Sequence, residues 1–168
     1  MPVDCSRSNV VVDAAGLFAG VSLSYPAVYT VEQVTEEVLD ERSRRGVEMA
    51  LASGKLVITR APEDFRDRVT EVARRLGVLY ELSKADVEVL ALAYYVKERC
   101  ASAVLYTDDT LVQNVAISLG IAVQGVKYPG RARARRYAYV CRACGYRATK
   151  PGECPRCGNK LQLELSTS

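Results

Sequence analysis

The sequence predicts an α/β protein with a mostly parallel sheet, followed by a small cysteine-rich module. Short runs rich in β-branched residues alternate with helix-like stretches up to residue 126, as is typical of parallel sheets covered by helices. A basic segment, KYPGRARARRY at 127–137, then breaks the pattern, and two Cys-x-x-Cys pairs follow it. The 168 residues suffice for one medium domain and an appendage.

The expected elements follow from local signals. Strands are predicted at 9–12, 55–59, 103–107 and 121–126, and helices at 31–42, 62–76, 83–100 and 109–119. The second helix begins with a proline suited to a first turn. The third opens with Ser-Lys-Ala-Asp, which resembles a capping box. The fourth stops before Gly120, a typical C-terminal signal.

Charge is divided unevenly along the chain. Residues 1–126 contain 13 Lys/Arg and 18 Asp/Glu, whereas residues 127–160 contain 10 Lys/Arg and one acid. A basic module on an acidic body indicates a polyanionic partner, most often nucleic acid, although a solvated basic linker is the alternative. We therefore expect a body at 1–126, a basic linker at 127–137 and the cysteine module at 138–165.

Two absences narrow the functional classes. The chain contains no histidine, so a histidine general base and mixed histidine–cysteine zinc ligation are both excluded. Its sequence has no apolar run near the ~18 residues that span a membrane, and its first residues do not resemble a signal peptide. A cytoplasmic protein whose chemistry depends on carboxylates and metal is expected.

The cysteine module is predicted to hold one structural zinc ion. Cys141, Cys144, Cys154 and Cys157 form two Cys-x-x-Cys-Gly knuckles separated by nine residues. Two such turns facing each other supply tetrahedral sulfur ligation with no open position. Disulfides and a redox site are the alternatives, and a cytosolic setting and the doubled motif disfavour them. The strand-like flanks YAYV and KLQLEL complete a zinc ribbon; Cys5 and Cys100 remain, and Cys100 is expected only to pack.

Acidic residues follow two of the predicted strands. Asp13 comes directly after NVVV, and Asp108 and Asp109 come after AVLYT. In an open parallel sheet, ligands bind outside the carboxyl ends of the strands, where strand order reverses. We therefore expect these acids to meet in one crevice. For Asp109 the alternative is a plain N-cap of the next helix.

Two further acids are candidates on helices. Asp86 stands at the start of a helix that is apolar nearly all round, which indicates a site, although a capping role is the alternative. Glu36 and Glu37 both flank the apolar stripe of the first predicted helix, and periodicity does not choose between them. A solvated helix face is the alternative for both.

Four blocks of sequence carry a family resemblance. VVDAAG, YTVEQVTEEVLDERSRR, LSKADVEVLALAYY and TDDTLVQNVA occur in this order ahead of the four cysteines. Together they resemble the Nob-type endonucleases, which are PIN-domain nucleases that mature the 3′ end of small-subunit rRNA. The resemblance covers nearly the whole chain, and the compact length is similar to that of archaeal members. It implies a doubly wound parallel sheet with helices on both faces, plus a zinc ribbon.

The resemblance also assigns the acidic site. It implies Asp13, Glu37 and Asp86 as catalytic acids, and it selects Glu37 because Glu37-Val38-Leu39-Asp40 matches the family pattern. The last acid is Asp108 or Asp109, and the Thr-x-Asp spacing favours Asp109. Clustered carboxylates require a cation, and all-oxygen ligands select Mg²⁺ or Mn²⁺. Thr107 is expected to orient a metal-bound water.

The implied activity is metal-dependent cleavage of precursor small-subunit rRNA. The expected phosphate contacts are Lys127, Arg131, Arg133, Arg135, Arg136, Arg142 and Arg147, with Arg42, Arg44 and Arg45 as additions from the body. The implied partners are the precursor rRNA, the pre-small ribosomal subunit and a KH-domain assembly factor, with no membrane. The alternatives are a toxin-like PIN ribonuclease acting on tRNA or mRNA and a non-catalytic RNA-binding assembly scaffold.

Overall fold

The body is built on a five-stranded, wholly parallel sheet. The computed structural model describes residues 3–130 and 133–167, so Arg131 lies outside the described residues. The strands are β1 (Val10–Val12), β2 (Val28–Thr30), β3 (Leu56–Ile58), β4 (Val104–Tyr106) and β5 (Ala122–Gln124). They lie in the order β3-β2-β1-β4-β5, and each neighbouring pair is parallel. The predicted α/β class is confirmed.

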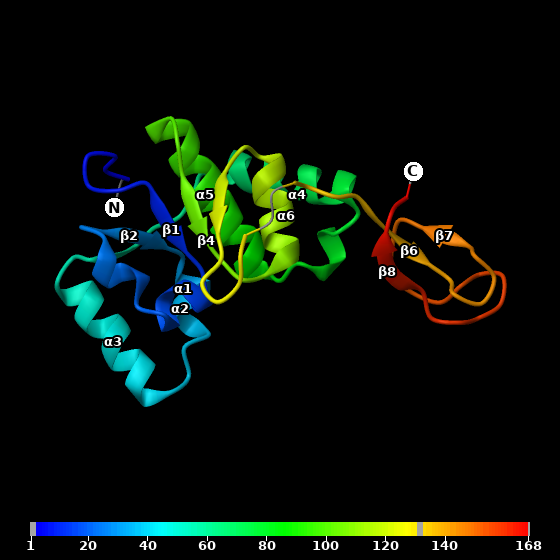
Figure 1. Ribbon diagram of the computed structural model, residues 1–168, viewed down its shortest axis with the longest axis horizontal. Coiled ribbons are helices and arrows are strands. Elements are labelled where there is room, and N and C mark those ends of the chain that lie inside the picture. The colour runs from blue at the N-terminus through cyan, green and yellow to red at the C-terminus, as the bar shows by residue number, and fades with distance from the viewer. Residues whose placement is uncertain (1–2, 131–132, 168) are drawn as a thin grey trace.

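Helices connect the strands (Figure 1). They are α1 (Ala14–Phe18), α2 (Glu32–Glu36), α3 (Glu41–Ala52), α4 (Glu63–Leu76), α5 (Lys84–Cys100) and α6 (Thr110–Ser118), with 3-10 turns at Val21–Ser24 (η1) and Leu79–Glu81 (η2). The predicted capping box is present, because the Ser83 and Asp86 side chains accept from each other's backbone N–H groups. In the part of the chain that the structure describes, no helix combines the length and apolarity needed to cross a membrane.

Two sequence-based assignments need correction. The single helix expected at 31–42 is interrupted, because the backbone of Asp40 is extended and its side chain caps α3 by accepting from Ser43 N at 2.8 Å. Strand β2 was not predicted at all. It is only three residues long and buried at every position, so it shows no alternation of polar and apolar residues.

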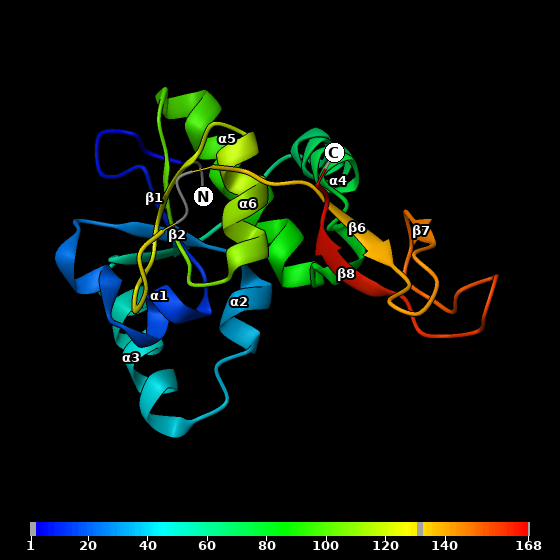
Figure 2. The same ribbon diagram turned by 45° about the vertical axis from the view of Figure 1, so that its right-hand side comes forward.

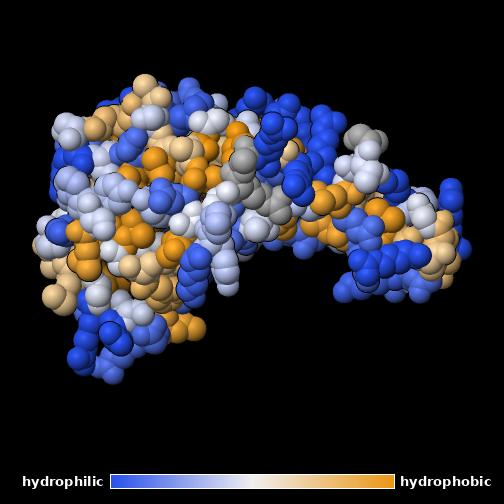
Figure 3. All heavy atoms as spheres, in the orientation of Figure 1, coloured by the Kyte–Doolittle hydropathy of each residue, from blue (hydrophilic) through white to orange (hydrophobic). Residues whose placement is uncertain are grey.

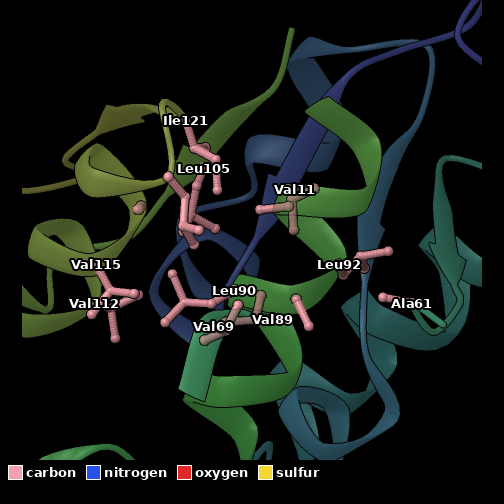
Figure 4. Close-up of a cluster of buried hydrophobic side chains, with 14 of the residues drawn as sticks. Val11, Ala61, Val69, Val89, Leu90, Leu92, Leu105, Val112, Val115 and Ile121 are labelled. Atoms are coloured by element: carbon pink, nitrogen blue, oxygen red, sulfur yellow. The ribbon is translucent and has the colours of Figure 1, made fainter. Parts of the chain in front are cut away.

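Helix α5 forms the centre of the main core. Its residues Val89, Leu90 and Leu92 are almost completely buried. Figure 4 shows them surrounded by Val11 of β1, Leu105 of β4, and Val112 and Val115 of α6. α4 also packs on α5, and Arg66 of α4 reaches the buried Glu88 at 3.0 Å. This packing fixes α5, and therefore its N-terminal Asp86, against the sheet.

The sheet reverses its winding between β1 and β4. The chain passes from β1 outward through β2 to β3, then returns to place β4 on the other side of β1. β1 and β4 are in register, with Val12 opposite Tyr106, and Asp13 N donates to Tyr106 O at 3.2 Å. The residues that follow these two strands therefore lie side by side at the carboxyl edge, the edge where all five strands end.

A second, antiparallel sheet forms the C-terminal module. It contains β6 (Tyr137–Val140), β7 (Arg147–Ala148) and β8 (Gln162–Leu165) in the order β7-β6-β8. Its buried residues are only Tyr139, Cys141, Cys154 and Leu161 among those described. Figures 1 and 2 show this module extending from one end of the body, joined to it by the segment before β6.

The module and its linker are docked on the body. The fully buried Asn114 of α6 donates from Nδ2 to Arg135 O at 2.7 Å and accepts from Arg135 N at 2.6 Å. The Tyr139 hydroxyl donates to Glu81 at 2.6 Å. A Cβ added at Gly77 would lie 2.0 Å from Tyr137 O, so the two backbones are in close contact. The segment at 133–137 is therefore a fixed connection.

Cys5 and Cys100 form a disulfide, which corrects the expectation that Cys100 only packs. The bond joins the segment before β1 to the last residue of α5, 95 positions later. Nearby, Val3 is buried, Asp4 N donates to the Tyr29 hydroxyl at 2.8 Å, and Arg99 Nε donates to Val3 O at 3.3 Å. The N-terminal segment is thus fixed near the start of the strands, at the edge opposite the acids.

Loss of this disulfide is expected to lower the free energy of unfolding by about 2–5 kcal/mol, because a long loop is no longer closed in the unfolded chain. Guanidinium unfolding of the oxidised protein and of the Cys5→Ser/Cys100→Ser variant measures the difference. A reductant that does not chelate zinc should lower the unfolding midpoint of the parent protein and leave that of the variant unchanged. Equal midpoints for parent and variant would contradict the prediction.

Candidate functional site

Asp13 links the end of β1 to the start of α1. It is the N-cap of α1, and its Oδ1 accepts from Gly16 N at 3.1 Å. The side chain is half-buried. Desolvation raises the pKa of Asp13, and the nearby charge of Asp108 raises it further, while hydrogen bonding from Thr107 and the α1 backbone opposes the shift. Asp13 is therefore a partly desolvated acid at the carboxyl edge of the sheet.

The turn after β4 places two more polar groups beside Asp13. Thr107 is completely buried, and its Oγ1 accepts from Asp109 N at 3.1 Å. Gln113 Nε2 donates to Thr107 O at 2.7 Å, and this bond stabilises the backbone of the turn. Asp109 caps α6, and its Oδ1 accepts from Leu111 N at 2.8 Å and from Val112 N at 3.1 Å. Asp109 is therefore the N-cap of α6, as the alternative interpretation expected, and both capping hydrogen bonds fall on the same carboxylate oxygen.

Asp108 differs from its neighbour in what its carboxylate binds. It accepts from the backbone N–H groups of Val126, Lys127 and Tyr128, at 2.7 Å, 3.1 Å and 3.4 Å respectively. Desolvation opposes its ionisation, but these three donors and the Lys127 charge outweigh it, so the pKa of Asp108 is lowered. Asp108 thus ties the loop after β5 to the turn after β4.

Asp86 and Glu37 come from neighbouring helices. Asp86 lies in the first turn of α5; the last residue of this helix lies just before β4, so its first turn is directed toward the carboxyl edge. α2, which packs against α5, follows β2 and ends at Glu36, so that the exposed Glu37 is its C-cap residue. Within the described residues, the acids do not form a tight cluster, because the four cysteines are the only group of three or more potential metal ligands that lie close together.

The cysteines form a compact group that can hold a metal ion. The Sγ atoms of Cys141 and Cys157 are 3.4 Å apart, and those of Cys144 and Cys154 are 3.5 Å apart. Each knuckle is closed by a backbone bond to its first cysteine, from Gly145 N and Gly158 N, both at 2.8 Å. Both glycines have positive φ, 73° and 76°, as the predicted turns require. The two predicted knuckles therefore face each other.

The basic residues are exposed on the linker and the module. Arg133, Arg135 and Arg136 lie between the body and β6, and all three side chains are exposed. In the module, Arg142 pairs with Glu164 at 2.7 Å, and Arg147 donates to the Ser166 hydroxyl at 3.0 Å. Such exposed contacts are weak, so they leave both guanidinium groups able to exchange to a phosphate.

Sequence reasoning missed two polar contacts that organise the site. Asn114 was interpreted only as part of a helix, although it fixes the linker. The loop that Asp108 holds was treated as the start of a flexible segment. The sequence did contain a signal for the first contact, which is the pair Gln113-Asn114 inside an otherwise apolar helix. Amide side chains at buried positions need hydrogen-bond partners, so this pair indicated a polar contact.

Comparison with known proteins agrees with this geometry. Residues 10–96 match the model of the family described as the PIN domain of ribonuclease. The chain is 35% identical to endoribonuclease Nob1 of Pyrococcus abyssi, over 94% of each chain. It is 36% identical to ribonuclease VapC3 of Aeropyrum pernix, over 74% of this chain and 90% of that protein. It is 34% identical to the 20S-pre-rRNA D-site endonuclease of Schizosaccharomyces pombe, over 53% of this chain and 23% of that protein.

Proposed function

The chain belongs to the PIN-domain ribonucleases and, among them, to the Nob1 endoribonucleases, and on this premise we propose that it cleaves precursor small-subunit rRNA at its 3′ end. Its substrate is the RNA of the pre-small ribosomal subunit, and it acts in the cytoplasm. Nob1 similarity extends over 94% of this chain, which includes the cysteine module. The D-site endonuclease of Schizosaccharomyces pombe, whose name specifies 20S pre-rRNA, is a relative.

One observation carries the catalytic part of the proposal. Asp13 is half-buried at the switch between β1 and β4, and its pKa is raised by burial and then by Asp108. A helix cap does not need burial next to a second carboxylate, and that arrangement costs free energy unless a cation balances the charge. A hard divalent ion bound at this edge would make the arrangement favourable.

The residues that would hold this ion are Asp13, Glu37, Asp86 and Asp109. Their oxygen donors suit Mg²⁺ or Mn²⁺, which would supply an activated water and neutralise charge on the phosphate. Asp109 is preferred to Asp108 because its two backbone bonds fall on Oδ1, whereas Asp108 is engaged by three N–H groups. Thr107 supports the site by bonding both Asp13 and Asp109 N.

The cysteine group fits one structural zinc ion. Tetrahedral ligation with Zn–S bonds of about 2.3 Å places the sulfurs about 3.8 Å apart. The closest observed Sγ–Sγ distances, 3.4 Å, 3.5 Å and 3.7 Å, are near this value. With four protein thiolates no position stays open for a reactant, so this ion stabilises the module and takes no part in hydrolysis.

RNA is held by the basic linker and module. Arg133, Arg135 and Arg136 follow a loop at the carboxyl edge and precede β6, so they lie between the acidic edge and the ribbon. Figure 3 shows the outline of the molecule recessed between the body and the module, below this linker. Asn114 fixes the backbone of Arg135, so these exposed arginines lie on a segment that is anchored to the body and that an RNA strand can follow.

Replacing Arg133, Arg135 and Arg136 with alanine is expected to weaken binding of all single-stranded RNAs alike. Each phosphate that is no longer neutralised should flatten the log–log dependence of affinity on salt by about 0.7, so the slope should change by about 2. A matched variant with Arg68, Arg74 and Arg75 of α4 replaced by alanine removes the same charge from another surface and should have a smaller effect. An unchanged slope with altered sequence preference would contradict phosphate binding by the linker.

The proposed function is tested by incubating the protein with precursor small-subunit rRNA and Mn²⁺ and mapping the cut. Cleavage at the 3′ end of the small-subunit sequence is the expected result. Cleavage of tRNA or mRNA in preference to this RNA would favour the toxin-like alternative. Binding without cleavage, with every acid intact, would favour an assembly scaffold.

A further inference from the structure

The loop after β5 is fixed to the carboxyl edge by a single side chain. In Gly125–Gly130, the backbone N–H groups of Val126, Lys127 and Tyr128 all donate to the Asp108 carboxylate, and Lys127 N reaches both of its oxygens at 3.1 Å. Consecutive N–H groups that converge in this way form an anion-binding concavity. Here the anion is the carboxylate of the chain itself, so the loop has one preferred position.

The loop is also closed tightly on itself. A Cβ added at Gly125 would lie 1.5 Å from Tyr128 O and 3.3 Å from an Asp108 carboxylate oxygen. Only glycine allows the backbone of residue 125 to approach that of residue 128 so closely. Glycine at 125 and the carboxylate at 108 together make the loop a rigid turn.

This turn presents an exposed aromatic ring beside the acids. The side chain of Tyr128 is 68% exposed, between Lys127 and Pro129. Tyr128 takes no part in the ring pairs found within the described residues, which involve Tyr25, Phe65, Tyr94, Tyr95 and Tyr106. The turn is bonded to Asp108, which neighbours Asp109 and interacts electrostatically with Asp13. An exposed aromatic ring on a backbone fixed by Asp108 therefore lies next to the proposed cleavage site.

We propose that Tyr128 is a stacking platform for an unpaired nucleobase of the RNA strand, and that Asp108 is the positioning residue that holds this platform. The inference rests on the proposed function and extends it to the form of the substrate near the cut. An aromatic face binds any unpaired base without reading its sequence. Lys127 on the same turn supplies positive charge for the adjoining phosphate, offsetting repulsion from the acidic edge.

The two consecutive aspartates then have separate tasks. Asp109 faces the ion site, and Asp108 orients the ring that receives the base. Binding of the base costs little backbone conformational entropy, because Asp108 already holds the loop in place. Stacking at this point would fix one nucleotide and so place its neighbouring phosphate relative to Asp13.

The test measures RNA binding without cleavage. In an Asp13→Asn background, affinity is measured by anisotropy with an oligoadenylate that carries a central 2-aminopurine, and stacking is followed by quenching of the 2-aminopurine fluorescence. Tyr128→Leu is expected to weaken binding about ten-fold and to reduce the quenching, since the π face is lost while an apolar side chain stays. Tyr128→Phe keeps the face and should restore both readouts. Phe18→Leu, at another exposed aromatic (53%), is the control.

The direction in which Asp108→Ala changes RNA affinity shows whether Asp108 positions Tyr128 or acts only through its charge. Removing a negative charge near RNA should tighten binding through electrostatics alone. If Asp108 positions Tyr128, the variant should instead bind more weakly and lose quenching, as Tyr128→Leu does. Tighter binding by Asp108→Ala, or unchanged affinity and quenching in the exposed Tyr128→Leu variant, would overturn the inference. Failure of the wild-type protein to cut precursor rRNA would overturn only the proposed function, because these binding readouts need no cleavage.

Discussion

Replacing Asp13 with asparagine is expected to slow RNA cleavage by at least about a thousand-fold, while the fold and RNA binding stay nearly intact. Asparagine preserves the shape of the side chain and can still accept from Gly16 N, so α1 keeps its cap. It removes the charge that balances the cation at the switch between β1 and β4. Single-turnover cleavage of precursor rRNA at saturating Mn²⁺ measures the loss.

Asp67→Asn provides the matched control for this prediction. Asp67 is an exposed acid on α4, and its replacement removes the same charge from the body. Cleavage should remain near the wild-type rate in that variant. Cleavage by the Asp13→Asn variant at the wild-type rate would show that the acidic edge is not the catalytic site.

Stability should respond to Asp13 in the opposite direction from catalysis. Because burial raises the pKa of Asp13 in the folded protein, its contribution to stability is complete below the pKa of the unfolded chain and is lost as pH rises through the folded pKa. Without divalent metal, Asp13→Asn should therefore unfold at a denaturant concentration equal to or above that of the wild type at neutral pH. Added Mn²⁺ should stabilise the wild type and not the variant.

The elements that were predicted correctly carry strong local signals. Helix α5 was found from its capping box and its long apolar run, β1 from its three β-branched residues, and β4 from its apolar run. The break between α2 and α3 was missed because the apolar pattern continues through Val38, which is buried although it lies outside both helices. Local periodicity does not register a change of backbone direction that is set by a cap at Asp40.

The part of the site that could be predicted from sequence is the part whose residues are positioned by the sheet topology alone. Residues that follow adjacent parallel strands must lie together, so Asp13 and the turn at Thr107–Asp109 could be brought together from sequence. The hydrogen bonds that distinguish Asp108 from Asp109 could not be predicted, because those of Asp108 come from a loop that begins 18 residues further along the chain. The Cys5–Cys100 bridge was equally inaccessible, since its two partners are far apart in sequence and only the packing of α5 beside the N-terminal segment joins them.

Removing zinc is expected to unfold the module at 138–165 while the body stays folded. The described core of the module has four residues, and two of them, Cys141 and Cys154, are proposed metal ligands. So small a core does not fold alone, and a structural zinc contributes about 10–16 kcal/mol at neutral pH. The body has its own core around α5, tied at one edge by a disulfide that contains none of the four ligands.

Amide NMR spectra recorded before and after chelation, and again after Zn²⁺ is restored, separate the two parts. Signals of β6, β7 and β8 should collapse and return, and those of β1 and α5 should persist. The body should lose only the support of its docking contacts, of which the Tyr139–Glu81 hydrogen bond is one, so its unfolding midpoint should fall slightly. Cys144→Ser should reproduce the chelated state. Loss of all cooperative unfolding would show instead that the Asn114–Arg135 clamp and Gly77–Tyr137 contact join the two parts into one folding unit.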